Sequence, residues 1–414
     1  MLVAVKGFPS VFKCFPGLPS RYRMEFVPLD GTNTMDIAFT PEQLAFRDEV
    51  RSFIEARLPA ATRSRLRQGH LPTKEETVAW QRILAERGWS APHWPREYGG
   101  AALGQAERLI LLDELYRAPA PLPQIFNMNM LGPVLMKFGT PAQRDFFLPK
   151  LASLELWFCQ GFSEPGAGSD LASLRTSARR EGDFYIVNGQ KTWTSTAQWA
   201  DWMFALVRTN PEARKQEGIS FLLIDLKTPG ITVRPIRSID GTDHVNEVFL
   251  EDVKVPVVNL VGEQDKGWDC AKFLLANERT GIANVGLCQE RLQLARELAG
   301  VGALAEDAGL RREFAVLDAE IRALELTNYR FLLTPSLQAA LPAFASVLKL
   351  KGTEIQQELH ALLARLAGAD GLEQPVSAEE GPHLVQRYLF SRALSIYGGT
   401  SEIQKDILAR TILA

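Results

Sequence analysis

The sequence is poor in the groups that build metal centres and disulfide frameworks. Its 414 residues include four cysteines, with no Cys-x-x-Cys pair, and five histidines without ligand spacing. Structural metal sites and disulfide scaffolds depend on such spacing. We therefore expect no metal, and we expect every thiol to be reduced and unligated: Cys14, Cys159, Cys270 and Cys288.

A basic surplus and long apolar runs are also absent. The formal net charge of −3 offers no basic surface for a phosphate backbone, so we expect no nucleic-acid partner. No apolar run approaches the roughly 20 residues that a membrane-spanning helix needs, so we expect no membrane insertion. The composition, 46% apolar and 23% charged, is typical of a globular protein, and the length suggests two or three domains.

The N-terminal stretch lacks acidic residues. Residues 1–23 contain four basic side chains and three prolines, without the Arg- and Ser-rich amphipathic pattern of a transit peptide. We expect residues 1–34 to be a disordered tail or an over-long start, with a transit peptide as the alternative. The expected location is the bacterial cytoplasm, with the mitochondrial matrix as the alternative.

The next region, residues 35–156, has helical periodicity. Thr40 and Glu42 open the amphipathic stretch "TPEQLAFRDEVRSFIEARL", in which Thr40 is the expected N-cap. The helical pattern is interrupted by "GWSAPHWPREYGG", whose glycines, prolines and tryptophans predict a packed loop. We expect an N-terminal helical domain.

Residues 157–266 have a different texture. Short β-rich runs ("DFYIVNGQKTWTS", "WMFALVR", "ISFLLIDL", "ITVRPI", "NEVFLEDVKVP") alternate with turn residues such as Asn188-Gly189 and Pro229-Gly230. From residue 267 to 414 the helical pattern returns, and "WDCAKFLLANERTGIANVGLCQERLQLARELAG" is expected to be one long helix. The segment 367–382, rich in Gly, Pro and acidic residues, predicts a surface loop.

Two motifs at the start of the β-rich region could bind a ligand. "CQGFSEPGAGSDLASL" combines glycines, which let backbone amides approach a planar or anionic ligand, with serine hydroxyls. "NGQKTWTSTAQWADW" follows, where Trp193 and Ser195 could offer a flat face and a hydroxyl. Taken separately, a structural turn and a buried core tryptophan explain them better.

Together, these motifs resemble the acyl-CoA dehydrogenase family from about Met35 to Ala414. The resemblance extends to "GWSAPHWPREYGG", "FGTPAQRDFFLPKL", "GISFLLIDLKTPGITVRPI", "NEVFLEDVKVP" and "IYGGTSEIQKDILAR". It implies a mainly α fold with a central β domain: an N-terminal helical domain, a middle β-barrel and a C-terminal four-helix bundle. It also implies bound FAD, an acyl-CoA substrate, and hydride transfer from the substrate Cβ to flavin N5.

The resemblance also assigns individual residues. Flavin contacts are implied for Gln160, Phe162, Ser163, Ser169, Trp193 and Ser195, and contacts near the pyrophosphate for Thr400 and Glu402. Substrate contacts are implied for Ser169, Asn277, Arg279 and Gly398.

The usual catalytic base of the family is missing. A glutamate is expected in a Tyr-Glu-Gly-Thr run, but this chain has Gly398 there, and glycine cannot accept the substrate's α-proton. Glu278 lies where the isovaleryl and long-chain branches carry their base. In a continuous helix Glu278, Ile282 and Val285 would share a largely apolar face, where desolvation would raise the carboxylate pKa. The alternative is a solvated Glu278 paired with Arg279.

Two further family motifs are degraded, and both grip the FAD of a neighbouring subunit. An Arg-x-x-Phe-Gly run is replaced by "GALAEDAGLRREF", and a Gln-x-x-Gly-Gly-x-Gly run by "RLAGADG". With Gly398, these losses resemble the subunits of mixed acyl-CoA dehydrogenases that act on steroid or bile-acid side chains. A second, homologous subunit in a mixed tetramer is therefore an expected partner. The alternative is a homo-oligomer in which Arg365, or another basic residue of the altered loop, binds the pyrophosphate.

The leading hypothesis is a catalytic subunit in which Glu278 takes the α-proton of a bulky or steroid-type acyl-CoA. Electrons would pass to an electron-transfer flavoprotein. Two alternatives remain at this point: a non-catalytic structural subunit of a heteromeric enzyme, and an acyl-CoA oxidase-like flavoenzyme.

Overall fold

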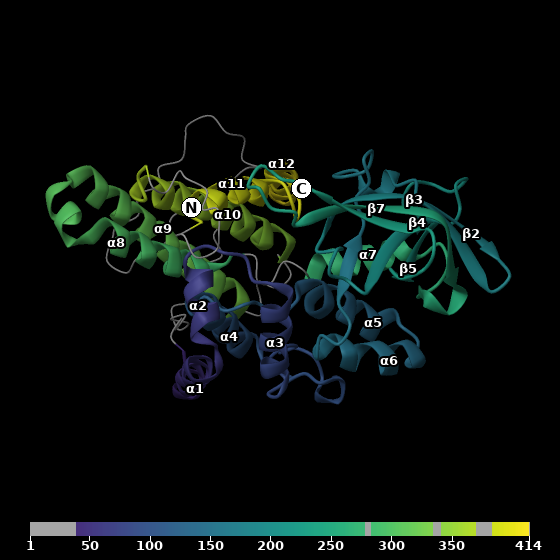
Figure 1. Ribbon diagram of the computed structural model, residues 1–414, viewed down its shortest axis with the longest axis horizontal. Helices are drawn as coiled ribbons and strands as arrows, with labels where there is room; N and C mark the ends of the chain where they lie inside the picture. Colours follow the sequence, from purple (N-terminus) through teal and green to yellow (C-terminus); the bar gives the residue numbers. More distant parts are fainter. Residues whose placement is uncertain (1–38, 278–282, 334–340, 370–382, 414) are drawn as a thin grey trace. The chain divides into compact units, whose positions relative to one another are not determined.

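The computed structural model describes residues 39–277, 283–333, 341–369 and 383–413 (Figure 1). Its first part is helical: α1 (Pro41–Arg57), α2 (Ala60–Arg67), α3 (Lys74–Ala85), α4 (Gln105–Arg117), α5 (Gly132–Phe138) and α6 (Pro141–Ala152). Thr40 caps α1 as expected, but Gln43 rather than Glu42 closes the capping box with it. A π-helical segment, η3 (Phe126–Leu131), precedes α5.

The "GWSAPHWPREYGG" segment is a packed loop, as its composition predicted. Its only regular element is a 3₁₀ turn, η2 (Arg96–Tyr98). Trp94 is fully buried, and its Nε1 donates to the carbonyl oxygen of Met128 in η3 at 2.9 Å. The loop therefore fixes the π-helical segment that leads into the sheet.

An eight-stranded sheet forms the middle part. Its strands are β1 (Phe158–Gly161), β2 (Ser177–Glu181), β3 (Phe184–Ser195), β4 (Trp202–Arg208), β5 (Ile219–Asp225), β6 (Ile231–Ile236), β7 (Val245–Pro256) and β8 (Leu260–Val261). The order is β6-β7-β3-β2-β4-β5-β8, with β1 parallel to β4. The expectations for β3 to β7 are confirmed, whereas the short strands β1, β2 and β8 carry too few residues for a visible alternating pattern.

One turn assignment in this region is wrong. Asn188-Gly189 lies inside β3, where the register with β7 shifts between Val187 and Gly189. A Cβ at Gly189 would lie 2.5 Å from Thr176 Oγ1, so the glycine permits a close approach of β3 to the residue just before β2. Pro229-Gly230 does lie in the turn between β5 and β6.

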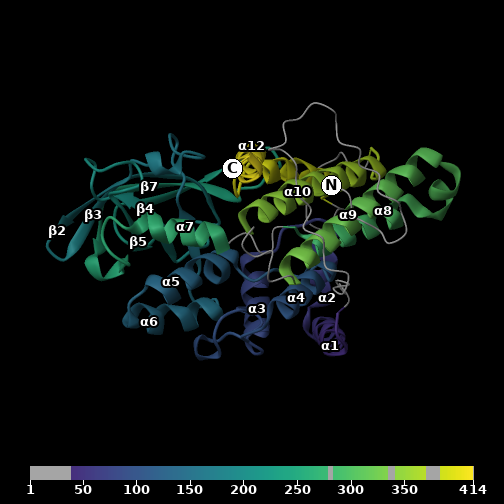
Figure 2. The ribbon, with the colours of Figure 1, turned by 180° about the vertical axis from the view of Figure 1, so that it is seen from behind.

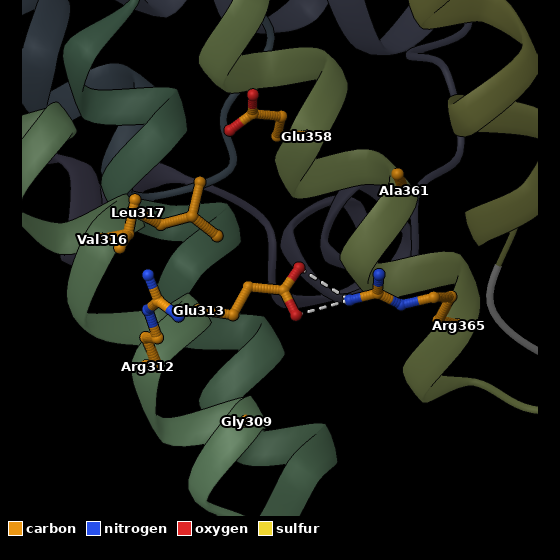
Figure 3. A pocket seen from close by; sticks show the side chains of 8 residues that line it. All are labelled: Gly309, Arg312, Glu313, Val316, Leu317, Glu358, Ala361 and Arg365. Carbon is orange, nitrogen blue, oxygen red and sulfur yellow. Dashed lines mark hydrogen bonds and ion pairs between the residues drawn. The ribbon is translucent and has the colours of Figure 1, made fainter.

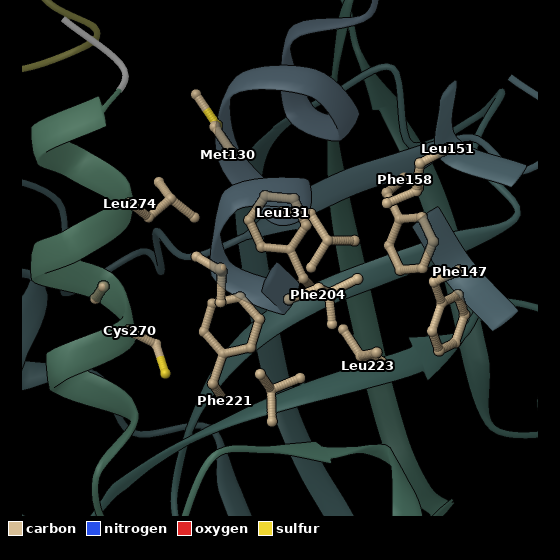
Figure 4. Close-up of a cluster of buried hydrophobic side chains, with 14 of the residues drawn as sticks. Met130, Leu131, Phe147, Leu151, Phe158, Phe204, Phe221, Leu223, Cys270 and Leu274 are labelled. Carbon is tan, nitrogen blue, oxygen red and sulfur yellow. The ribbon is translucent and has the colours of Figure 1, made fainter. Parts of the chain in front are cut away.

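Both faces of the sheet are buried. In β4, Phe204 and Leu206 face one core and the alternate residues face the other. The first core is covered by η3, α5, α6 and α7 (Gly267–Asn277), and Figure 4 shows Cys270 of α7 across from Phe221 of β5. Helix α7 therefore packs on the sheet.

The long helix expected after residue 267 is not continuous, and this expectation is wrong. Helix α7 ends at Asn277, and α8 (Val285–Glu306) begins after Asn284, whose φ of 50° is left-handed. Helix α8 is itself interrupted at Gly300, with φ 70°. Helical periodicity does not reveal a single left-handed residue, because an asparagine adopts that conformation at little cost.

The last part is a helical bundle around α10 (Leu341–Leu366). Helix α10 contacts α8, α9 (Ala308–Leu333), α11 (Leu384–Ser391) and α12 (Ser401–Leu413) (Figure 2). The described helices include none that is long and apolar enough to cross a membrane. The predicted loop 367–382 lies mostly outside the described residues.

Candidate functional site

The glycine-rich loop after β1 forms a closed turn. Glu164 and Ala167 exchange two backbone hydrogen bonds of 3.0 Å. Gly166 and Gly168 are exposed, and a Cβ at either position would meet nothing within 4 Å. The backbone is therefore open to a ligand, with Ser169 exposed beside it.

A buried ion pair joins this loop to β3. The Nζ of Lys191 donates to Glu164 Oε1 at 2.8 Å, and to the carbonyl oxygens of Phe162 at 3.3 Å and Leu206 at 2.7 Å. The Lys191 side chain is 0% exposed and that of Glu164 is 8% exposed. Both residues stand inside the two sequence motifs, but their role as a tie between them was not predicted.

The surroundings keep both members of this pair charged at neutral pH. Glu164 also accepts from the backbone N–H groups of Arg175 at 2.7 Å and Thr176 at 2.9 Å. Burial acts to raise the pKa of Glu164, but Lys191 and these hydrogen bonds hold it below its ordinary value. Burial lowers the pKa of Lys191 to about 8, against the attraction of Glu164. One ion pair thus ties the loop to β3 and to the start of β2.

We expect Lys191→Met to lower the free energy of unfolding by about 3 to 5 kcal/mol, because it leaves a buried carboxylate without its counter-ion. Urea unfolding measures this change. The matched control is Lys215→Met, which breaks a 2.8 Å pair with Asp170 whose side chains are 60% and 61% exposed. This control should lose less than about 1 kcal/mol. Equal losses in the two variants would contradict the role of the buried pair.

Strand β3 ends in a bulge that holds Trp193 outward. The register with β7 shifts between Lys191 and Thr194, and Trp193 has a φ of 56°. A bulky residue keeps this left-handed conformation only where the surrounding structure enforces it, which is common at functional sites. Trp193 is 61% exposed, so the alternative of a core tryptophan is wrong.

The loop and the end of β3 are neighbours. Thr192 N donates to Ser163 O at 2.9 Å, and Ser163 and Ser195 are both half-buried. The Phe162 ring packs in the core, with its centroid 5.7 Å from that of Phe204, so only the main chain of Phe162 is available to a ligand. Gln160, half-buried in β1, pairs in register with Phe204.

The second group of expected cofactor contacts lies at the start of α12. Thr400 Oγ1 accepts from Ile403 N at 3.3 Å, and Glu402 is exposed in the first turn. A hydrogen bond from its own backbone N–H and one from Thr400 lower the pKa of Glu402. The N-terminus of a helix favours anions, but this carboxylate already supplies a negative charge there.

A buried glutamine fixes the turn before α12. Gln404, 1% exposed, donates through Nε2 to Gly398 O at 3.0 Å, and its Oε1 accepts from Ser346 of α10 at 2.7 Å. Gly398 and Gly399 have φ values of 64° and 88°. The usual base position is therefore a left-handed glycine held against the bundle, beside the exposed Tyr397. Nothing in the sequence pointed to Gln404.

The expected base lies outside the described residues, as does Arg279, and Asn277 is the last residue of α7. The helical-face argument for Glu278 is wrong as stated. Because Asn284 is left-handed, no continuous helix carries Glu278 and Val285 on a shared face at a spacing of seven residues.

The two degraded motifs come together between α9 and α10 (Figure 3). A hollow of about 360 Å³ is lined by Gly309, Arg312, Glu313, Val316, Leu317, Glu358, Ala361 and Arg365. Arg365 Nη2 lies 2.6 and 2.7 Å from the two carboxylate oxygens of Glu313. Burial, followed by neighbouring carboxylates, raises the pKa of Glu358. Of the two arginines that line this hollow, Arg365 therefore already has a counter-ion.

These residues fit one half of a flavin cofactor. An exposed indole, an open glycine turn and two half-buried serines offer a flat face and hydrogen-bonding groups to a ring system. In the hollow of Figure 3, Arg365 is a poor fit for the pyrophosphate of a neighbour's cofactor, because its guanidinium group is engaged by Glu313.

Comparisons with known proteins cover nearly the whole described chain. Three family models match: the acyl-CoA dehydrogenase N-terminal domain over residues 40–155, the middle domain over 159–253 and the C-terminal domain over 265–413. The acyl-CoA dehydrogenase IpdE1 of Mycobacterium tuberculosis is 38% identical over 347 residues, which is 82% of this chain and 88% of that protein.

Two solved structures are also similar. The Tcur3481-Tcur3483 steroid ACAD has a TM-score of 0.81 and 32% identity, covering 92% of this chain and 99% of that one. The ChsE4-ChsE5 complex from Mycobacterium tuberculosis has a TM-score of 0.78 and 34% identity, with coverage of 92% and 99%.

Proposed function

The chain belongs to the acyl-CoA dehydrogenase family, and from that premise we propose that it is the catalytic subunit of an enzyme that dehydrogenates a bulky or steroid-type acyl-CoA. The family consists of flavoprotein oxidoreductases that act on acyl-CoA esters. The observation that carries the proposal is the buried ion pair of Glu164 and Lys191, which joins the two motifs that would bind the flavin ring, in a chain with Gly398 at the usual position of the base.

Different residues of this chain would bind the flavin ring and accept the substrate's α-proton. The main chain of Phe162, with Ser163, Trp193 and Ser195, would hold the flavin ring, while Gln160 and Ser169 border it. When bound, FAD supplies the acceptor for the hydride that leaves the substrate Cβ. Glu278 would accept the α-proton, because Gly398 offers no carboxylate.

The other expected contacts complete this assignment. Thr400 and Glu402, at the start of α12, would border the pyrophosphate region of FAD. Asn277, Arg279 and Gly398, together with Ser169, would line the path of the acyl-CoA.

The proposed acyl group rests on Gly398 and on the relatives. A glycine at this position leaves room where most of the family has a glutamate side chain, and one similar structure is that of a steroid ACAD. A pocket enlarged in this way should favour ring-bearing acyl groups over slender ones.

We expect bulky ring-bearing esters to exceed octanoyl-CoA in kcat/KM by at least about tenfold, since a difference of one or two buried groups in a pocket is worth roughly 1 to 3 kcal/mol. A panel of acyl-CoA esters, measured with an artificial electron acceptor, checks this expectation. A preference for octanoyl-CoA would refute the proposed substrate class and leave the dehydrogenase activity intact.

The proposed electron acceptor is an electron-transfer flavoprotein, and the proposed location is the bacterial cytoplasm.

Two other functions compete with this proposal. A purely structural subunit would not need an intact Trp193 bulge and glycine turn together, and an oxidase-like enzyme would pass electrons to oxygen.

One experiment separates these functions. The chain is expressed with and without a homologous partner, and the bound flavin is titrated anaerobically with acyl-CoA. Bleaching of a yellow protein that reoxidises slowly in air supports the dehydrogenase. A colourless chain in every preparation would favour the structural subunit, and fast reoxidation by oxygen would favour the oxidase.

A further inference from the structure

The end of β3 is a strained segment of backbone. Trp193 and Thr196 both have a φ of 56°, in the left-handed region that residues other than glycine, asparagine and aspartate rarely adopt. Trp193 is bulky and Thr196 is β-branched, so the conformation is unfavourable at both positions. Two such residues three positions apart therefore need contacts elsewhere in the fold that hold them.

Neighbouring elements hold the second of these residues. Strand β7 lies beside β3 in the sheet (Figure 1). Thr196 N donates to the carbonyl oxygen of His244, directly before β7, at 2.9 Å. The indole Nε1 of Trp157, directly before β1, donates to Thr196 Oγ1 at 3.2 Å. Thr196 is therefore held through both its backbone and its side chain.

A buried asparagine of β7 holds the other end of the segment. Asn246 is 0% exposed, and its Nδ2 donates to Thr194 O at 3.0 Å and to Gln198 Oε1 at 2.6 Å. Gln198 Nε2 in turn donates to Asp243 O at 2.9 Å. Because both partners of Asn246 Nδ2 are acceptors, the hydrogen-bond network fixes the orientation of this amide.

The bond from Asn246 to Thr194 acts at the bulge itself. Thr194 pairs with Asn246 where the register of β3 with β7 resumes after the shift that starts at Lys191. Thr194 is 1% exposed, whereas the preceding Trp193 is exposed. Asn246 therefore fixes the backbone directly after Trp193, and with it the direction in which the Trp193 side chain leaves the strand.

We propose that Asn246 is a positioning residue for the flavin ring, because it holds the bulge that aims the Trp193 indole. This inference rests on the proposed function, in which Trp193 holds the ring. The Asn246 side chain acts only through its neighbours, since it is buried and its donor group is engaged by Thr194 and Gln198. An indole that is already aimed needs less ordering when the ring binds, which strengthens binding.

The test combines Asn246→Asp with Trp193→Ala in the full chain, expressed with the homologous partner. Asn246→Asp keeps the size of the side chain and replaces the donor with an acceptor. Two readouts need the cofactor: the Kd of FAD, and the visible absorption bands of the bound flavin, which respond to the groups around the ring. The third is the fluorine NMR signal of Trp193 in flavin-free protein labelled with fluorotryptophan, assigned by its loss in Trp193→Ala.

We expect Asn246→Asp to weaken FAD binding by about 10- to 100-fold, because the buried Thr194 carbonyl oxygen loses its donor and faces a second acceptor. The flavin bands and the Trp193 signal should shift as well. In the Trp193→Ala background, Asn246→Asp should weaken FAD binding by less than about threefold, since residues that act as a unit are not additive.

Two further variants separate this role from a general loss of stability. Asn188 braces the other register shift of β3, with its Nδ2 2.9 Å from Asp252 Oδ1 and its Oδ1 2.9 Å from Asp252 N. Asn188→Ala should leave all three readouts unchanged. Gln198→Ala, at an exposed position, removes one partner of Asn246 and should shift all three readouts in the same direction as Asn246→Asp, by about two- to fivefold in Kd.

Equal losses from Asn246→Asp in the unmodified and Trp193→Ala backgrounds, or an unmoved Trp193 signal, would overturn the positioning role. If Asn246→Asp does not fold, Gln198→Ala decides, and an unchanged Kd and Trp193 signal in that variant would overturn it equally. If Trp193→Ala keeps the Kd of FAD and the flavin bands, the flavin contact of the proposed function fails. The Trp193 signal then still reports whether Asn246 holds the indole, so the two failures are distinguished.

Discussion

Glu278→Gln is expected to reduce substrate-driven flavin reduction by about two to four orders of magnitude, the usual range for the loss of a general base. The amide keeps the size of the side chain but cannot accept the α-proton. Gly398 leaves no substitute in the run where the family usually carries its base. Stopped-flow reduction under anaerobic conditions, with saturating acyl-CoA, measures the effect on the chemical step.

The control for this variant is Glu263→Gln, which removes a carboxylate from an exposed position in the turn before α7. Its reduction rate should stay within about twofold of the unmodified chain, as expected for a surface substitution away from the site. Bound FAD and the Kd of the ester should remain unchanged in both variants. Fast reduction in Glu278→Gln would contradict the assignment of the base.

Returning a carboxylate to position 398 is a poor rescue of Glu278→Gln. Gly398 has a φ of 64°, and a residue with a side chain pays roughly 1 to 2 kcal/mol in that conformation. Gln404 also holds the Gly398 carbonyl oxygen at 3.0 Å. We expect Gly398→Glu to recover only a small fraction of the lost rate, and only on slender acyl chains.

The fold followed from periodicity wherever an element was long enough. Strand β4 coincides with "WMFALVR", and β5 lies within "ISFLLIDL". The features that were not predicted depend on few residues. Strands β1, β2 and β8 are short, and the break before α8 depends on the backbone conformation of Asn284 alone. The Tyr116 hydroxyl donates a hydrogen bond to Asn284 Oδ1 from 168 residues away in the sequence. A local sequence pattern does not reveal such an interaction.

The parts of the candidate site that lie in the two sequence motifs could be predicted. The glycine turn and the Trp193 segment were selected from the sequence, and the structure makes them neighbours through Thr192 and Ser163. The buried pair of Glu164 and Lys191 was overlooked because glutamate and lysine side chains usually face solvent. Gln404 was overlooked because its partners, Ser346 and Gly398, are distant or featureless in sequence.

We expect the second large effect in cofactor retention: alone, this chain should hold FAD about 100- to 10,000-fold more weakly than with a homologous partner. In the family, an arginine and a glutamine-glycine run from the neighbouring subunit hold the pyrophosphate end. Two such charge-assisted contacts are worth about 1.5 to 3 kcal/mol each, and their combined loss corresponds to this range of Kd. Equilibrium dialysis of FAD against each preparation measures the difference.

The ion pair between Arg365 and Glu313 argues against FAD binding by a homo-oligomer. A homo-oligomer would need Arg365 to bind the pyrophosphate, but its guanidinium group already lies 2.6 and 2.7 Å from the Glu313 carboxylate oxygens. Removing Arg365 should therefore leave FAD binding unchanged within about twofold. Arg296→Ala, which breaks a comparable 2.9 Å pair with Asp318 and does not line the hollow, is the matched control.

Glu313→Gln provides the opposite test, because it releases Arg365 from its counter-ion. The freed cation should strengthen FAD binding by the chain alone by up to about tenfold, since one charge-assisted contact is regained in part. Asp318 lies on α9, as Glu313 does, and its Oδ1 lies 2.9 Å from Arg296 Nη2 of α8. Asp318→Asn should therefore have no such effect on FAD binding. If the chain alone is a homotetramer with one tight FAD per subunit, and Arg365→Ala releases that FAD, then Arg365 binds the pyrophosphate and a mixed oligomer is not required.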